Sequence, residues 1–243
     1  MRTPLWEGQS SEGESILKFE LHPVAKSLWL LLTFGAFALL CEVVYAIEIL
    51  TPTMLLSLAL TRVNWWGVVT SPLVHLSGSH IANDAGSITL LSILMYALAN
   101  WRKDWKPPVL AMCVLPFASA IGANVVYYVL SPNPMGAGSS GVAYGMMGVA
   151  LAYSMRGTLQ SLTAVDWLGI RSRLVKPKVA IQPVALYLAV FVVMTAQVVW
   201  SPSAFLNAEP GVNYGIHGLA FILGLFSMFI YGMVQKLVGG SEE

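Results

Sequence analysis

The sequence contains very few charged residues. Only 10% of its 243 residues are Asp, Glu, Lys or Arg, whereas a soluble domain has about 25%. Hydrophobic residues make up 56% of the chain, and the mean hydropathy is +0.70. The formal net charge of +1 gives no basic surface of the kind that binds nucleic acid, so no nucleic-acid partner is expected. The composition indicates an integral membrane protein.

Cysteine is nearly absent as well. The two cysteines, Cys41 and Cys113, both lie in apolar runs, which is typical of small core residues and excludes a disulfide framework. No metal site or cofactor is expected. No cleavable signal peptide is apparent, because residues 1–25 are polar and mixed in charge. We expect a short cytoplasmic N-terminal segment over 1–25, a membrane domain over 26–236 and a short tail over 237–243.

The chain does contain long apolar runs. A bilayer core requires roughly 20 apolar residues per helix. Six segments meet this need and predict an all-α membrane protein with six spans, at 27–50, 79–100, 107–130, 139–156, 182–200 and 214–236. The segment 51–78 is too broken to span the bilayer and too apolar for an ordinary loop. Its Trp65 and Trp66 are typical of a membrane interface.

The basic residues predict the orientation of these spans. With six spans, every Lys and Arg except Arg62 falls on one side of the membrane. The positive-inside rule places that side in the cytoplasm. Both termini are therefore expected in the cytoplasm, and the loops at 131–138 and 201–213 outside. We expect a multi-pass protein of the plasma membrane.

Polar residues gather at the outer ends of three predicted helices. The helices that run inward from outside begin near His80, at Ser139 and Ser140, and near His217. A serine or glycine in a membrane helix more often serves packing than chemistry. However, three of the four histidines fall at this end, and ionisable groups at that depth are costly. Their clustering therefore favours a functional site facing outward.

Serine and histidine together favour nucleophilic catalysis. Serine becomes a nucleophile when a base takes its proton, and His217 can do so for Ser140. The N-terminus of a helix offers free backbone N–H groups for an oxyanion, and His80 can add a side-chain donor. Tyr144 lies one turn after Ser140 on the same helix face, where it can pack against the imidazole of His217. No third member of a triad is apparent.

Three stretches carry a family resemblance. Residues 138–141 read G-S-S-G and match the motif G-x-S-G, with SGVAYGMMG as its continuation. His217 opens the last helix and is followed by Ala220 and Gly224. The stretch WWGVVTSPLVHLSGSH, which contains His75 and His80, is similar to a first external loop and second-helix start. Over residues 26–236 the chain resembles the rhomboid intramembrane serine proteases.

The resemblance implies a six-transmembrane-helix rhomboid-like bundle and a specific reaction. Ser140 rather than Ser139 matches the nucleophile, with His217 as its base and Tyr144, Gly138 and Gly141 as supporting residues. The implied reaction is hydrolysis of a peptide bond in or near a transmembrane segment of a membrane protein substrate. A helical backbone hides its carbonyls, so the substrate has to unwind locally before Ser140 can attack. The implied partners are such substrates and the lipid bilayer, with no cofactor.

One position departs from the family pattern. The family usually has H-x-x-x-N, with the asparagine binding the oxyanion. Here His80 is followed by Asn83 and then by Asp84. At roughly 100° per residue, both lie within about 60° of His80 around the helix. Three alternatives remain open: Asn83 takes the role through a local shift, a protonated Asp84 donates, or Ser140 N–H and His80 suffice. We favour Asn83, since an ionised carboxylate accepts but cannot donate.

Three other functions were weighed. An inactive rhomboid-like protein that binds membrane clients typically lacks the serine or the histidine, and both are present here. A transporter or channel is disfavoured because the sequence shows no inverted repeat and no polar residues through the full depth. A metal hydrolase could use three histidines and a carboxylate, namely His75, His80, His217 and Asp84. However, the chain has no H-E-x-x-H motif.

Overall fold

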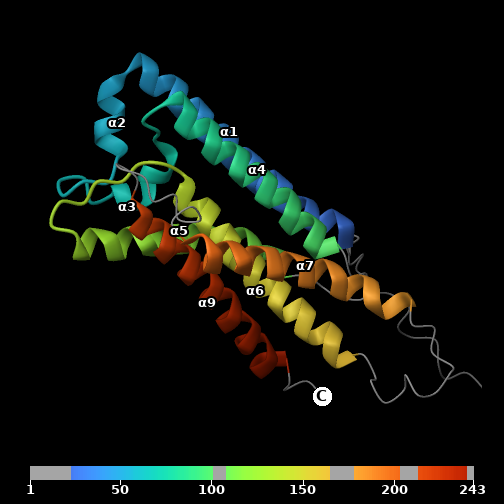
Figure 1. Cartoon of the computed structure of the whole chain (residues 1–243). Coiled ribbons are helices and arrows are strands. Elements are labelled where there is room, and N and C mark those ends of the chain that lie inside the picture. The colour runs from blue at the N-terminus through green and yellow to red at the C-terminus, as the bar shows by residue number, and fades with distance from the viewer. Residues whose placement is uncertain (1–22, 101–107, 165–177, 203–212, 240–243) are drawn as a thin grey trace, which may run out of the picture.

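The structure is a computed structural model that describes residues 23–100, 108–164, 178–202 and 213–239 (Figure 1). These residues form helices joined by short loops, with one isolated bridge between Leu60 and Gly136. The elements in chain order are α1 (Pro23–Leu50), α2 (Pro52–Leu58), α3 (Gly67–Thr70), the 3₁₀ helix η1 (Ser71–Leu73), α4 (Gly78–Asn100), α5 (Val109–Leu130), α6 (Ser140–Ala164), α7 (Lys178–Trp200) and α9 (Tyr214–Gly239).

The expectation of an all-helical membrane protein is confirmed for the described residues, and each predicted span coincides with one long helix. Four helical segments are long and apolar enough to cross a membrane: Lys26–Leu50, Gly78–Asn100, Val109–Leu130 and Tyr214–Gln235. The helix α7 contributes a shorter apolar stretch, Ala185–Trp200. The helix α6 has 25 residues but is rich in Gly, Ser and Thr, and it does not reach the same hydropathy. Six spans therefore stay a prediction.

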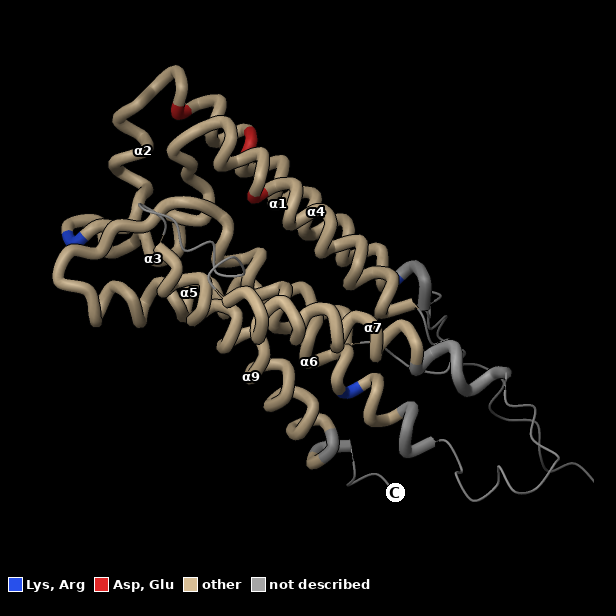
Figure 2. Tube along the Cα trace, viewed as in Figure 1, with Lys and Arg blue, Asp and Glu red and all other residues tan. Residues whose placement is uncertain are grey.

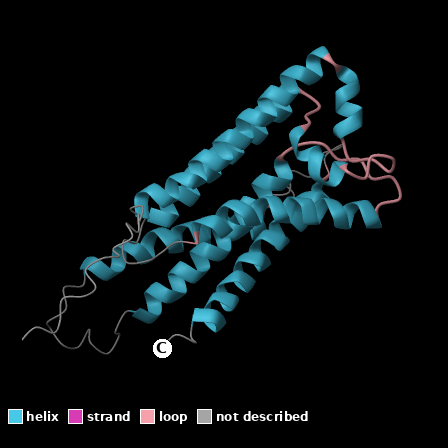
Figure 3. Ribbon diagram, turned by 180° about the vertical axis from the view of Figure 1, so that it is seen from behind, coloured by secondary structure: helices cyan, strands magenta, loops and turns pink. Residues whose placement is uncertain are grey.

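The helices are arranged around α6. This helix packs against α4, α5, α7 and α9, while α1 runs beside α4. Figures 1 and 3 show α2, α3 and the loops around them gathered at one end of the bundle. The buried face of α6 carries small and apolar side chains, among them Val142, Ala143, Met146, Val149 and Ala150. The segment 51–78 thus forms short helices at one end, in agreement with the prediction that it does not span.

Glycines bring α6 and α9 into direct backbone contact. A Cβ added to Gly148 would fall inside van der Waals distance of the carbonyl oxygen of Phe221, and one added to Gly224 would meet the carbonyl oxygen of Gly145. On the other side, a Cβ on Gly145 would lie 2.7 Å from the carbonyl oxygen of Pro116 in α5. Small residues allow membrane helices to approach this closely. The glycines therefore fix the distance between the helices that carry Ser140 and His217.

Charged residues are distributed unevenly along the bundle (Figure 2). Glu42 and Glu48 lie in the half of α1 that leads to α2, and Asp84 lies near the start of α4, which follows α3 and η1. Lys26, at the start of α1, and Arg156, in the second half of α6, lie far along their helices from the α2 end. Arg62 is the exception at the α2 end. Its guanidinium donates to the carbonyl oxygens of Tyr128 and Pro132 at 3.1 and 3.2 Å, and so ties the loop before α3 to the end of α5.

The glycine contact leads to a stability prediction. Gly224→Ala should lower the free energy of unfolding by about 1–3 kcal/mol, the usual cost of overpacking, because the new Cβ collides with the backbone of Gly145. Gly35→Ala in α1 is the matched control, since a Cβ there meets nothing within 4 Å. Thermal unfolding of the two variants in detergent measures the difference. Equal midpoints would contradict the contact.

Candidate active site

Ser140 and His217 lie at the starts of two neighbouring helices. Ser140 is the first residue of α6, and His217 lies in the first turn of α9. The Oγ of Ser140 is 2.8 Å from Nε2 of His217, although the residues are 77 apart in sequence. When the hydroxyl donates this hydrogen bond, Nε2 is the acceptor, and the imidazole is placed to take the serine proton. The structure thus brings together the two residues that the sequence predicts as nucleophile and base.

The ring of Tyr144 stacks on the imidazole of His217. Their centroids are 4.3 Å apart with an interplanar angle of 15°. Tyr144 is buried, so its ring forms a fixed surface that restricts rotation of the imidazole. This is the arrangement that the one-turn spacing from Ser140 predicts. Gly141, in contrast, has no strict steric role, because a Cβ there would meet Ala120 at an ordinary 3.5 Å.

The pair opens onto a cavity of about 810 Å³. Its wall includes six of the residues predicted for the site, namely His80, Asn83, Gly138, Ser140, Gly141 and His217. The rest of the wall comes from the α2–α3 region, α5, the loop before α6 and the start of α9. The cavity can therefore bring a peptide segment to Ser140 from the end of the bundle where the loops lie.

Gly138 shapes the approach to Ser140. Its φ of +112° is one that residues with a side chain rarely adopt. Its N–H donates to the carbonyl oxygen of Ser71 at 3.0 Å, which fastens the loop to η1. A Cβ at this position would lie 2.6 Å from Nε2 of His80. Glycine therefore allows the loop that enters α6 to lie directly against the His80 ring.

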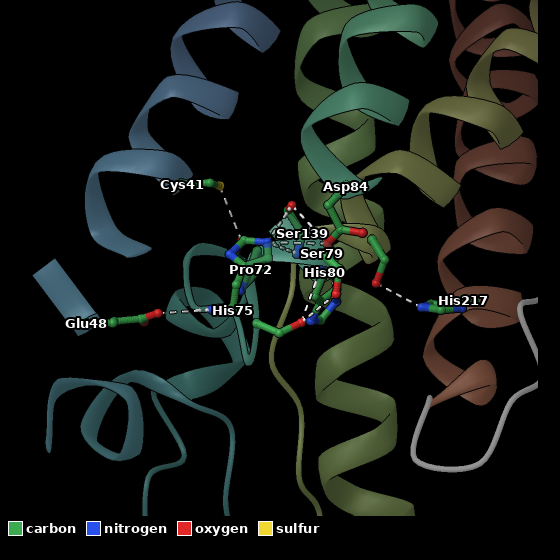
Figure 4. A network of polar contacts seen from close by, with 11 residues as sticks. Cys41, Glu48, Pro72, His75, Ser79, His80, Asp84, Ser139 and His217 are labelled. Atoms are coloured by element: carbon green, nitrogen blue, oxygen red, sulfur yellow. Dashed lines mark hydrogen bonds and ion pairs between the residues drawn. The ribbon is translucent and has the colours of Figure 1, made fainter. Parts of the chain in front are cut away.

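A second polar cluster lies beside the Ser140–His217 pair and is shown in Figure 4. The Oγ of Ser139 donates to Oδ2 of Asp84 at 3.2 Å and lies 3.1 Å from Nε2 of His75. The same Asp84 oxygen is 3.4 Å from Nε2 of His75 and 3.6 Å from Nε2 of His80. Glu48 in α1 accepts a hydrogen bond from the backbone N–H of His75 at 3.2 Å. The cluster joins α1, α4, α6 and the loop after η1.

Ser139 therefore also has a histidine and a carboxylate nearby, but its geometry differs from that of a catalytic triad. In a triad the serine and the carboxylate contact opposite ring nitrogens, whereas here both contact Nε2 of His75. Ser139 is 1% exposed and is not part of the cavity wall. Ser140 lines the cavity. Of the two serines, the arrangement supports Ser140 as the nucleophile.

Asn83 and Asp84 face different surroundings. Both residues contribute to the cavity wall, but Asp84 is buried and held in the cluster, whereas Asn83 is exposed. Sequence reasoning missed the contacts of Asp84 with Ser139 and His75, and the role of Glu48 as an acceptor. An ionisable residue inside an apolar span is a signal for such a network, and both Glu48 and Asp84 carried that signal. Within the described residues, no group of three or more His, Cys, Asp or Glu is arranged to hold a metal ion.

Comparison with known families gives one match. The family model described as the Rhomboid domain matches residues 62–235. This range begins in the loop before α3 and includes every residue of the site described above except Glu48. Comparison with curated proteins finds none that matches the sequence.

Proposed function

The chain belongs to the rhomboid family, and we propose that it is an intramembrane serine endopeptidase with Ser140 as nucleophile and His217 as base. Its apolar helices and its family make it an integral multi-pass membrane protein. The observation that carries the proposal is the 2.8 Å contact between Ser140 Oγ and His217 Nε2, at the wall of an open cavity. The proposed substrates are membrane proteins, cleaved in or near a transmembrane segment.

In the proposed reaction, His217 Nε2 takes the proton of Ser140 as Oγ attacks the scissile carbonyl carbon. The proton then passes to the leaving amine, and the N-terminal part of the substrate remains as an acyl ester on Ser140. His217 next takes a proton from a water molecule that attacks this ester, and it returns that proton to Ser140 Oγ as the ester bond breaks and the new carboxyl end is released. Serine and histidine are regenerated, and no cofactor takes part.

The oxyanion of this reaction would be bound at the start of α6. Ser139 accepts the first helical hydrogen bonds, from the N–H groups of Val142 and Ala143 at 2.9 and 3.3 Å. The N–H of Ser140 therefore precedes the helical hydrogen-bond ladder and can donate to the oxyanion, aided by the helix dipole. His80 and Asn83, both at the cavity wall, are the proposed side-chain donors. Together these groups would stabilise the charge that develops in the transition state.

We also propose that both termini lie in the cytoplasm and that the site faces outward across the plasma membrane. Lys26 lies at the start of α1, far from the α2 region that lines the cavity, and Arg156 lies in the second half of α6, far along that helix from Ser140. This distribution is the one that the positive-inside rule requires. A reporter inserted at 132–134 should read as external, and one within 158–175 as cytoplasmic. A cytoplasmic signal from 132–134 would overturn the orientation of the site.

The nucleophile and base lead to a prediction for cleavage. Ser140→Ala and His217→Ala should each abolish cleavage of a model transmembrane substrate, and the double variant should lose no more, because the two residues act as one unit. Ser140→Ala should also abolish labelling by a fluorophosphonate, whereas Ser139→Ala should retain labelling and measurable cleavage. Cleavage assays and gel-based labelling in detergent provide the measurements.

Two outcomes would contradict this assignment. If Ser139→Ala were inactive and Ser140→Ala active, the nucleophile would be Ser139. If the folded wild-type protein bound transmembrane segments without cleaving them or reacting with the fluorophosphonate, the chain would be an inactive family member that binds membrane clients.

Asn83 leads to a separate kinetic prediction. Asn83→Ala should lower kcat with little change in KM, because a hydrogen bond to the oxyanion strengthens only in the transition state. The loss of one such donor costs about 100- to 1000-fold in rate where the others do not compensate. Steady-state kinetics on a fluorogenic transmembrane substrate provides the measurement. An unchanged kcat would leave Ser140 N–H and His80 as the oxyanion donors.

A further inference from the structure

We propose that Asp84 is a positioning residue that keeps a proton on Nε2 of His80, and that Ser139, which His75 holds in place, keeps Asp84 where it can do so. The inference rests on the proposed protease function for its kinetic consequence. The tautomer of His80, in contrast, can be measured without any substrate.

Three side chains converge on one oxygen atom of Asp84. Oδ2 of Asp84 lies 3.2 Å from Ser139 Oγ, 3.4 Å from His75 Nε2 and 3.6 Å from His80 Nε2. These contacts come from the start of α6, the loop after η1 and α4 itself. Three separate segments thus meet at Asp84, which fixes the position of its carboxylate (Figure 4).

Two of these three partners are fully enclosed. The side chain of His75 is 0% exposed, and Ser139 is 1% exposed. Buried polar groups need hydrogen-bond partners, and Asp84 supplies an acceptor for the Ser139 hydroxyl. Glu48 fixes His75 from the other side through its backbone N–H. The backbone N–H of Ser139 donates to Nε2 of His75 at 3.3 Å, so His75 fixes Ser139, and the hydroxyl of Ser139 in turn holds the carboxylate of Asp84. This support gives a role to the second serine beside Ser140.

The third partner, His80, is the one that reaches the cavity. Its side chain is 30% exposed, and it lines the cavity wall. Its Nε2 edge faces Gly138 in the loop that leads to Ser140, where an added Cβ would lie 2.6 Å away. Within the described residues, Asp84 is the one polar side chain in contact with this ring nitrogen.

The distances define what Asp84 does to His80. A neutral imidazole carries its hydrogen on one nitrogen, and a nearby acceptor selects which one. A separation of 3.6 Å is close enough for the carboxylate to favour hydrogen on Nε2, but too long for a full hydrogen bond. Because Ser139 lies closer to the same oxygen, the Nε2 hydrogen of His80 stays available to an oxyanion. Asp84 would thus act through His80, without donating to the oxyanion itself.

The kinetic experiment compares Asp84→Asn with Glu42→Gln, a matched change of carboxylate to amide at an exposed site in α1. Asp84→Asn should lower kcat by about 10- to 100-fold with KM nearly unchanged, less than the loss expected from deleting a donor outright. Glu42→Gln should be neutral. In a His80→Ala background, Asp84→Asn should cause no further loss, because a residue that acts through His80 has no effect without it.

The structural experiment measures the His80 tautomer by NMR of the ¹⁵N-histidine-labelled protein in detergent. The chain has four histidines, so the His80 signals are assigned by their absence in His80→Gln. In wild type and Glu42→Gln, the Nε2 shift should be that of a protonated nitrogen. In Asp84→Asn, part of the population should move hydrogen to Nδ1, with an unchanged melting midpoint. Ser139→Ala should produce a smaller shift in the same direction.

Several outcomes would overturn the proposal. These are an unchanged His80 tautomer in Asp84→Asn, an unchanged kcat in that variant, or an equal loss of kcat with and without His80. The proposed function can fail separately. If wild type neither cleaves substrate nor reacts with a fluorophosphonate, the NMR result still decides whether Asp84 sets the tautomer of His80.

Discussion

The contact between the backbones of α6 and α9 is the constraint on which the site depends. Ser140 and His217 sit at the ends of these two helices, and their 2.8 Å separation is set by how closely the helices pack. Glycine at 148 and at 224 removes the side chains that would hold these two helices apart. The stacking of Tyr144 on His217 depends on the same close packing, because Tyr144 lies on α6 and His217 on α9. The contact between Ser140 and His217 thus depends on helix packing about two turns further along α6 and α9.

The close packing of α6 comes with a lower hydropathy of this helix. The glycines and serines that allow α6 to pack closely against its neighbours also leave it less apolar than α1, α4, α5 and α9. A helix of this kind gains little by contacting lipid, and it is surrounded by α4, α5, α7 and α9. The residues just before Ser140 are not helical. A membrane protein tolerates such irregular backbone only where protein or water surrounds it. The cavity meets that condition.

The sequence predicted the long helices and the proximity of Ser140 and His217 better than the polar cluster beside them. Helices were predictable because apolar runs of span length have few alternatives, and Ser140 and His217 because motif order placed them at one end. The sequence could not decide whether Asn83 or Asp84 contacts His80. The two residues follow His80 by three and four positions, so both lie on its side of the helix. Their environments depend on where α4 begins and on how Ser139 and His75 pack against it. Those are tertiary contacts, and helix periodicity does not encode them.

The charge of the cavity wall bears on the choice of chemical inhibitors. Asp84 is its one carboxylate, and no Lys or Arg lines the described wall. Arg62, the basic side chain nearest this end, is already bound to main-chain oxygens of Tyr128 and Pro132. An electrophile that carries a carboxylate would therefore enter without a counter-charge and with a like charge beside it. Neutral or cationic serine-directed compounds match this pocket better than anionic ones.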